Sequence, residues 1–229
     1  MRRRTILLSV GSLLIGVSLL LYFLAKQRPD FYERSLIANS DQRSLLSADF
    51  VNRYTNLTTG AEGSSKHWHE EFTTEQINSF LQHDYLSESG EYKKPPSGFH
   101  DVRIQVEDGM LRIGCRYKSG IGTTIVTLNA KMWLIEGETN LIAVELTNLR
   151  AGALPVPRQV LLDHISEAAA KSNFGVNWRH IDDNPVAILR FQADKEQPTI
   201  QIDRLEVRHG RIIVAGRTIQ YPIPNIPAN

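Results

Sequence analysis

Histidines and carboxylates are the residues of this chain whose types and spacing could support chemistry. The densest group is His67-Trp68-His69-Glu70, in which the two histidines would share one face of a strand and could bind zinc. No further spaced set of ligands accompanies them, and they precede a helix cap in a polar stretch. We therefore interpret the segment as a loop and predict no metal site.

Two further pairs have spacings that occur in catalytic sites. His164 and Glu167 stand three residues apart on an expected helix, which is the spacing found in di-iron bundles. Such sites need partners from other helices, so we expect these two residues on an exposed polar face. Asp182 and Asp183 precede an Asn-Pro pair, which favours a turn rather than a carboxylate pair acting together.

The usual signatures of enzymes do not occur in the sequence. There is no Gly-x-Ser-x-Gly elbow, no P-loop and no dinucleotide fingerprint. We therefore expect no catalytic residue and no cofactor, and an enzyme such as a hydrolase is the third alternative considered. Cys115, the single cysteine, falls in an alternating apolar run and is interpreted as a small core residue. The net charge of +1 gives no indication of a nucleic-acid partner.

The N-terminus has the pattern of a membrane anchor. Arg2–Arg4 are followed by an uncharged stretch, Thr5–Ala25, long enough as a helix to cross a bilayer. Tyr22 and Phe23 near its end suit the membrane interface. A cleaved signal peptide is the alternative, but no small-x-small cleavage site precedes Lys26. We predict a single-pass anchor with lipid as partner and the C-terminal domain outside the cytoplasm.

The chain is predicted to have four parts. These are an anchor with a short basic cytoplasmic end, a juxtamembrane helical segment with a loop, an α+β domain and a proline-rich tail, over residues 1–28, 29–66, 67–219 and 220–229. Apolar residues in the second part recur at helical intervals. This helix could lie on lipid, or its apolar stripe could pack on the domain, which is the interpretation we prefer.

The start of the domain carries strong local signals. Thr73 and Gln76 have the spacing of a capping box, and Phe72 with Ile77 that of a hydrophobic staple. From Phe99 the apolar period changes to two, and Asp108-Gly109 supplies a tight hairpin turn between strands at 102–107 and 111–117. Two more strands, near 123–135 and 140–149, predict an antiparallel meander.

A glycine- and proline-containing junction, 152–157, then leads into a predicted long helix, and strands resume around 185–193, 199–208 and 211–218. The segments 104–113 and 205–214 resemble each other at corresponding positions. Either a duplication or the alternation common to all hairpins explains this likeness.

The Phe72–Asn78 helix opening, the Val102–Tyr117 hairpin, the Gly152–Pro157 junction and the Ile202–Thr218 hairpin together resemble known families. The chain is similar to the YpmS-like proteins of bacteria and to an uncharacterised membrane-anchored family of planctomycete-type bacteria. More distantly it resembles LmeA-like phospholipid-binding domains. The resemblance implies a curved antiparallel sheet wrapped around a long helix, lined to hold lipid, and implies no catalytic residue.

These observations lead to one expected fold and two main functional hypotheses. The fold is α+β, with an N-terminal transmembrane helix followed by a curved antiparallel β-sheet wrapped around a long helix. The first hypothesis is a membrane-anchored envelope protein that binds lipid or another hydrophobic ligand in a groove lined by Trp133, Leu154, Leu161 and Ile165. The alternative is a protein-binding scaffold of the cell envelope with a fully packed core.

Overall fold

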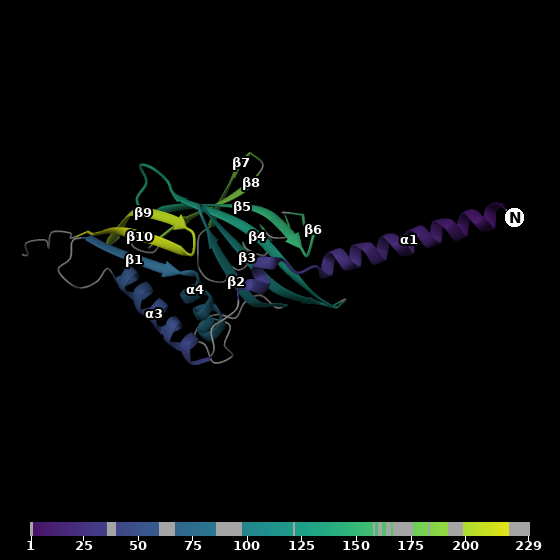
Figure 1. Ribbon diagram of the computed structural model, residues 1–229. Coiled ribbons are helices and arrows are strands. Elements are labelled where there is room, and N and C mark those ends of the chain that lie inside the picture. Colours follow the sequence, from purple (N-terminus) through teal and green to yellow (C-terminus); the bar gives the residue numbers. More distant parts are fainter. Residues whose placement is uncertain are drawn as a thin grey trace, which may run out of the picture.

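The protein folds mainly into antiparallel β-sheet, with helices at its N-terminal side (Figure 1). The computed structural model describes residues 2–35, 40–59, 67–85, 98–120, 122–157, 159, 162–163, 166, 176–182, 184–191 and 199–219. The described helices are α1 (Arg2–Lys26), α2 (Asp30–Arg34), α3 (Ser40–Thr59) and α4 (Thr74–Phe80), the last continued by a turn of π-helix (Leu81–Tyr85).

The strands form two sheets. The smaller has the order β1-β10-β9, built from β1 (His67–Thr73), β9 (Ile200–Arg208) and β10 (Arg211–Thr218). The larger has the order β2-β3-β4-β5-β8-β7, with β6 paired to β5. Its strands are β2 (Phe99–Glu107), β3 (Met110–Ser119), β4 (Gly122–Leu134), β5 (Leu141–Ala151), β6 (Leu154–Pro155), β7 (Val176–Ile181) and β8 (Asn184–Arg190).

The elements with strong local signals form as predicted. Gly109 takes a φ of +72° in the β2–β3 turn, a conformation that glycine adopts without strain. The meander β2 to β5 is confirmed, with every neighbouring pair antiparallel. The capping box is also confirmed, because the Gln76 amide donates to the Thr73 hydroxyl at 3.2 Å and the Thr73 amide donates to the Gln76 side chain at 2.7 Å.

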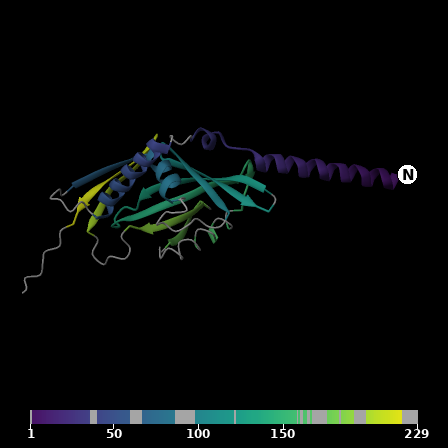
Figure 2. The ribbon, with the colours of Figure 1, turned by 90° about the horizontal axis from the view of Figure 1, so that it is seen from below.

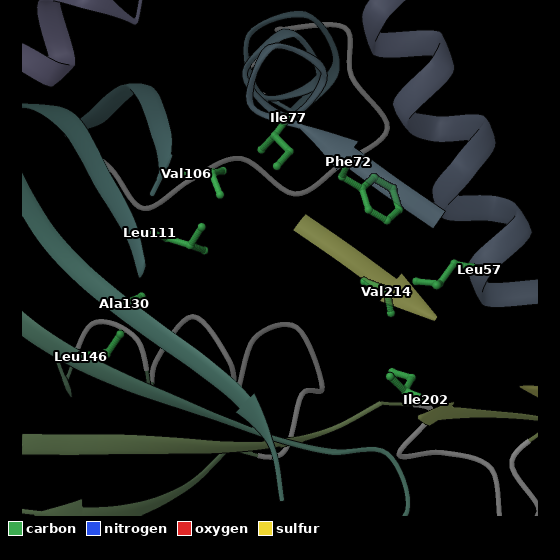
Figure 3. Packing of buried hydrophobic residues seen from close by; sticks show 9 residues of the cluster. All are labelled: Leu57, Phe72, Ile77, Val106, Leu111, Ala130, Leu146, Ile202 and Val214. Carbon is green, nitrogen blue, oxygen red and sulfur yellow. The ribbon is translucent and has the colours of Figure 1, made fainter. Parts of the chain in front are cut away.

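The main core lies between the two sheets and the α3–α4 pair (Figure 3). Its buried residues come from α3, α4 and both sheets: Leu57, Phe72, Ile77, Val106, Leu111, Ala130, Leu146, Ile202 and Val214. Phe50 of α3 extends this core by stacking against Phe80 at a ring-centroid distance of 4.6 Å. The prediction that the apolar stripe after residue 29 packs on the domain is therefore confirmed for α3.

The two hairpins that resemble each other in sequence meet turn to turn. The Gly109 amide donates to the Val207 carbonyl at 2.8 Å, and the Gly210 amide donates to the Val106 carbonyl at 2.9 Å. In the two similar segments Gly109 corresponds to Gly210, and Val106 corresponds to Val207. Each glycine therefore bonds the corresponding valine of the other hairpin, and the two bonds are reciprocal. The sequence likeness between the hairpins therefore coincides with equivalent positions in the fold.

The expected fold is wrong in its central feature. The described residues form two packed sheets, and no long helix among them lies inside a curved sheet. Side chains from opposing strands and from α3 and α4 fill the interior that this helix was expected to occupy. The residues expected to form it after Pro157 lie mostly outside the described ranges.

The expected transmembrane helix is also not found. In the part of the chain that the structure describes, no helix has both the length and the apolar character needed to cross a membrane. Two smaller expectations need correction as well. His67–Glu70 was predicted as a loop and belongs to strand β1, and strand β7 was not predicted at all.

Candidate functional site

The most unusual surface of the molecule is that of α1. From residue 12 to residue 23 its side chains are exposed on every side, including large apolar ones with exposed fractions of 44 to 68%: Leu13, Leu14, Ile15, Val17, Leu19, Leu20, Leu21, Tyr22 and Phe23. Figures 1 and 2 show α1 projecting away from the sheets rather than lying along them. A helix that is apolar all round normally has its surface covered by something other than water.

The C-terminal end of α1 is bonded to the larger sheet. The Ala153 amide donates to the Leu24 carbonyl at 2.9 Å, and the Lys26 ammonium donates to the Thr123 carbonyl at 2.7 Å. The Thr124 hydroxyl donates to the Ala25 carbonyl. We call these three hydrogen bonds the latch. Two of them satisfy the Leu24 and Ala25 carbonyls, which the last turn of a helix leaves without intrahelical partners, and the third joins the Lys26 side chain to a carbonyl of β4.

Two glycines let the helix end approach the sheet closely. Gly152 has a φ of +60°, and a Cβ at this position would stand 2.4 Å from the Leu24 carbonyl oxygen and 2.6 Å from that of Ala25. Gly122 has a φ of +123°, and a Cβ there would stand 2.6 Å from the Lys26 Nζ. Any larger residue at position 152 would meet main-chain atoms, which cannot rotate away as a flexible side chain can.

A second polar cluster fixes α2 immediately after the latch. Tyr32 is 1% exposed, and its hydroxyl donates to the Asp101 main-chain carbonyl at 2.7 Å. Arg103 donates to the Tyr32 carbonyl at 2.8 Å and makes two bonds of 3.0 Å to the Asp101 carboxylate. The Arg103 guanidinium also lies 4.6 Å from the Tyr32 ring centroid, a cation–π contact.

The electrostatics of this cluster follow from burial and pairing. Burial and then the neighbouring Asp101 carboxylate raise the pKa of Tyr32 well above its usual range. Burial alone would raise the pKa of Asp101, but the hydrogen bonds from Arg103 to its carboxylate and the charges of Arg103 and Arg116 lower it overall. Tyr32 therefore stays neutral and Asp101 stays ionised, an arrangement suited to holding α2 and not to proton transfer.

One cavity lies beside this cluster, with a volume of about 250 Å³. It is half open to solvent and lined by both polar and apolar residues: Phe31, Arg34, Ser35, Thr74, Glu75, Asn78, Ser79, Gln105, Val106, His209 and Gly210. The Asn78 side chain already bonds the main-chain amide and carbonyl of Ile104, at 2.7 and 2.8 Å. Its amide therefore has a structural role in joining α4 to β2.

The residues predicted to line a ligand groove do not come together in the described part of the chain. Trp133 pairs with Ala143 and packs near Val186 and Ile188, whereas Leu154 pairs with Ala151 at the other end of β5. Eight residues of strand separate the two places, or about 26 Å. Leu161 and Ile165 lie outside the described residues, so a groove involving them stays a prediction.

The other candidate residues, the two histidines before the capping box and Cys115, lie within strands. His67 and His69 lie on one exposed face of β1, as a strand requires, and no group of three or more metal-ligating side chains occurs among the described residues. Cys115 is half-buried in β3, and burial raises the pKa of its thiol to about 12, so it is not a nucleophile at neutral pH.

Sequence reasoning missed the residues that make the latch and the α2 cluster. Thr123, Thr124, Tyr32 and Asp101 carry no motif, because each acts through a contact with a segment far away in the chain. Only the Gly152–Pro157 junction was recognised, and it was interpreted as the connection that leads into a helix.

Comparison with known proteins adds no relative. No protein-family model, no curated protein and no solved structure matches the chain. The resemblance to YpmS-like and LmeA-like families therefore stays a prediction, and the functional argument depends on the geometry of α1 and its latch.

Proposed function

We propose that the protein is a membrane-attached scaffold, in which α1 places its apolar side chains among lipid chains and the β-sheet domain is held at the lipid surface. The observation that carries the proposal is the contrast along α1. Its apolar residues up to Phe23 are exposed, and its next three residues are bonded to the domain or packed on it.

Lipid explains this contrast better than a folded partner would. Burying one large apolar side chain is worth about 1.5–3 kcal/mol, and α1 exposes nine of them on all sides. A protein partner usually covers one face of a helix, whereas lipid surrounds it. Tyr22 and Phe23 lie at the end of the apolar stretch, where aromatic residues meet the polar boundary of a bilayer.

The packed interior supports a scaffold over a lipid carrier. The described core contains side chains from both sheets, and Val106, Ala130 and Val186 are at most 2% exposed. The cavity beside α2 is about 250 Å³, below the roughly 300–1,000 Å³ of typical ligand pockets. Its lining includes Arg34, Glu75 and His209, which do not suit an acyl chain.

Vesicle flotation tests the attachment. The full chain is mixed with phosphatidylcholine vesicles, and the fraction that floats is compared with that of the double variant Leu14→Glu/Leu20→Glu. Each carboxylate would cost about 3 kcal/mol among lipid chains, so the variant should partition at least about a thousandfold less. Leu45→Glu is the matched control, because Leu45 is 72% exposed on α3 and should float like the unmodified chain.

Two outcomes would contradict the attachment. One is an unmodified chain that stays at the bottom of the gradient while sedimenting as a folded monomer. The other is a double variant that floats as well as the Leu45→Glu control.

A substitution in the core distinguishes the scaffold hypothesis from the lipid-carrier hypothesis. Ala130 is 2% exposed between the sheets, and Ala130→Leu should lower the free energy of unfolding by about 1–3 kcal/mol through overpacking. A hollow, lipid-accepting interior would accommodate the larger side chain and give no loss or a gain. Urea unfolding of the full chain measures the difference, with the exposed helical position Ala48→Leu as control.

A further inference from the structure

The structure places a set of cations beside the latch. Lys26 ends α1, Lys118 stands opposite Thr123 in the β3–β4 register, and Arg150 stands opposite Thr127 in the β4–β5 register. Thr123 and Thr127 are four residues apart on β4, so the two cations of the sheet flank this strand within about 13 Å along it. We call Lys26, Lys118 and Arg150 the cationic rim.

The charges of the rim are not neutralised by the described part of the domain. Lys118 and Arg150 are exposed, and the contacts described for Lys26 and Arg150 go to neutral groups. Lys26 contacts the Thr123 carbonyl and lies 5.5 Å from the Tyr22 ring centroid, and Arg150 bonds the Asn148 side chain at 2.8 Å. The carboxylates of α2 and of the cluster that fixes it form ion pairs with other cations: Asp30 with Arg34, Glu33 with Arg28, and Asp101 with Arg103. The chain as a whole has a net charge of only +1, so the rim is a local excess of positive charge.

The latch fixes where this excess lies. Bonds from Thr124 and Ala153 hold the end of α1 against the same end of the sheet that carries Lys118 and Arg150. Figures 1 and 2 both show α1 leaving the domain beside this end of β4 and β6. If the apolar part of α1 lies in lipid, the rim is therefore held at the depth of the headgroups.

We propose that the cationic rim binds the headgroups of anionic phospholipids, so that the protein prefers an anionic membrane surface. This inference rests on the proposed function, because it needs α1 in lipid. A lysine or arginine near an anionic surface contributes a factor of about five to the partition coefficient, and the effect is screened over a Debye length of about 8 Å at physiological salt.

The test compares two kinds of vesicle. Partition coefficients of the full chain are measured by flotation on phosphatidylcholine alone and on a 7:3 mixture with phosphatidylglycerol, at low and at physiological salt. The unmodified chain should prefer the mixture by at least about 25-fold at low salt, from fivefold for each of Lys118 and Arg150. Higher salt should reduce this preference.

A variant that removes two positive charges of the rim tests whether the rim causes the preference for anionic vesicles. Lys118→Gln/Arg150→Gln should lose about 25-fold on the mixed vesicles and stay unchanged on phosphatidylcholine. The matched control is Lys131→Gln/Arg179→Gln, because both residues are exposed and lie in one row across the sheet. Lys131 is eight residues along β4 from Thr123, or about 26 Å. Far-ultraviolet circular dichroism checks that each variant is folded.

The outcomes separate the two proposals. If no vesicle binds the unmodified chain, the membrane attachment and the rim both fail. If both vesicle types bind it equally, or if the control variant loses as much as the rim variant, the attachment survives and the anionic headgroup site is overturned.

Discussion

The latch makes a sharp prediction at Gly152. Gly152→Ala should loosen the end of α1 from the sheet, because the new Cβ would stand 2.4 Å from the Leu24 carbonyl oxygen and 2.7 Å from the Ala25 carbonyl carbon. Both obstacles are main-chain atoms, so the helix end must move as a unit. The movement would break all three latch bonds, because each of them joins the end of α1 to the sheet.

The magnitude follows from two separate contributions. An alanine at positive φ costs about 1–2 kcal/mol through contact of its own Cβ with the backbone. Three latch bonds of about 1 kcal/mol each add about 3 kcal/mol to the local effect, which is about a hundredfold in the equilibrium for latch opening. Gly137→Ala isolates the first contribution, because Gly137 has a φ of +78° with open space around its Cβ position.

Amide hydrogen exchange of the full chain in detergent micelles measures the effect. The Ala153 amide should exchange about a hundredfold faster in Gly152→Ala than in the unmodified chain, and at the unmodified rate in Gly137→Ala. Both variants should lose about 1–2 kcal/mol of global stability from the positive φ. If Ala153 exchanges equally fast in the two variants, the close approach of helix and glycine has no energetic role and the reasoning is refuted.

Three further predictions concern the domain itself. The pKa of Asp101 is lower in the folded chain than in the unfolded chain, where it is about 3.9, so the ionised carboxylate stabilises the fold at pH values above about 3.9, and this stabilisation is lost as the pH falls through the folded-state pKa. Asp101→Asn should therefore lower the free energy of unfolding by about 2 kcal/mol at pH 7. Urea unfolding at pH 7 and pH 3 should show a smaller loss of stability in acid for this variant than for the unmodified chain. Asn140 is 2% exposed, and its side chain bonds main-chain groups of Ile200 and Ile202. Asn140→Ala should therefore lower the free energy of unfolding by about 3 kcal/mol, measured by thermal unfolding. Asn140→Gly should lose less than the alanine variant, by only the amount that comes from the φ of +55° at this position. The Cys115 thiol, with a pKa of about 12, should react with iodoacetamide about a thousandfold more slowly in the native chain than in urea; a native rate near the unfolded one would contradict its burial.

The features that the sequence predicted well depend on short stretches of chain. The capping box at Thr73 and Gln76 needs four residues, and the β2–β3 hairpin needs alternation with Asp108-Gly109 between its halves. In such elements the partners of each main-chain group are a few residues away, so residue type and spacing are sufficient to predict them.

Strand β1 shows why other features were missed. His67-Trp68-His69-Glu70 is polar at three of four positions and was therefore interpreted as a loop. It becomes a strand because β10, some 150 residues later, supplies its hydrogen-bond partners, with Trp68 lying over Gly216. Pairing across that separation has no signal in the local composition.

The predicted long helix illustrates a different limit. The sequence indicated which segments are apolar, but not which of them would meet in the interior. The described interior is filled by strands of both sheets together with Leu57 and Ile77. Since apolar periodicity is the same for a helix that lies inside a sheet and one that lies elsewhere, it could not distinguish these arrangements.

In the Gly152–Pro155 segment, a local sequence signal and a contact with a distant part of the chain coincide. Its composition marked it as special, and the sequence alone suggested a turn into a helix. The structure indicates a stronger reason for its glycine, since the end of α1 passes within 2.4 Å of where a Cβ would be. With Tyr32 fixed only six residues after Lys26, the chain between latch and α2 is too short to act as a free tether. The direction of α1 is thereby coupled to the orientation of the sheets, and a membrane contact made by one determines which surface of the other faces lipid.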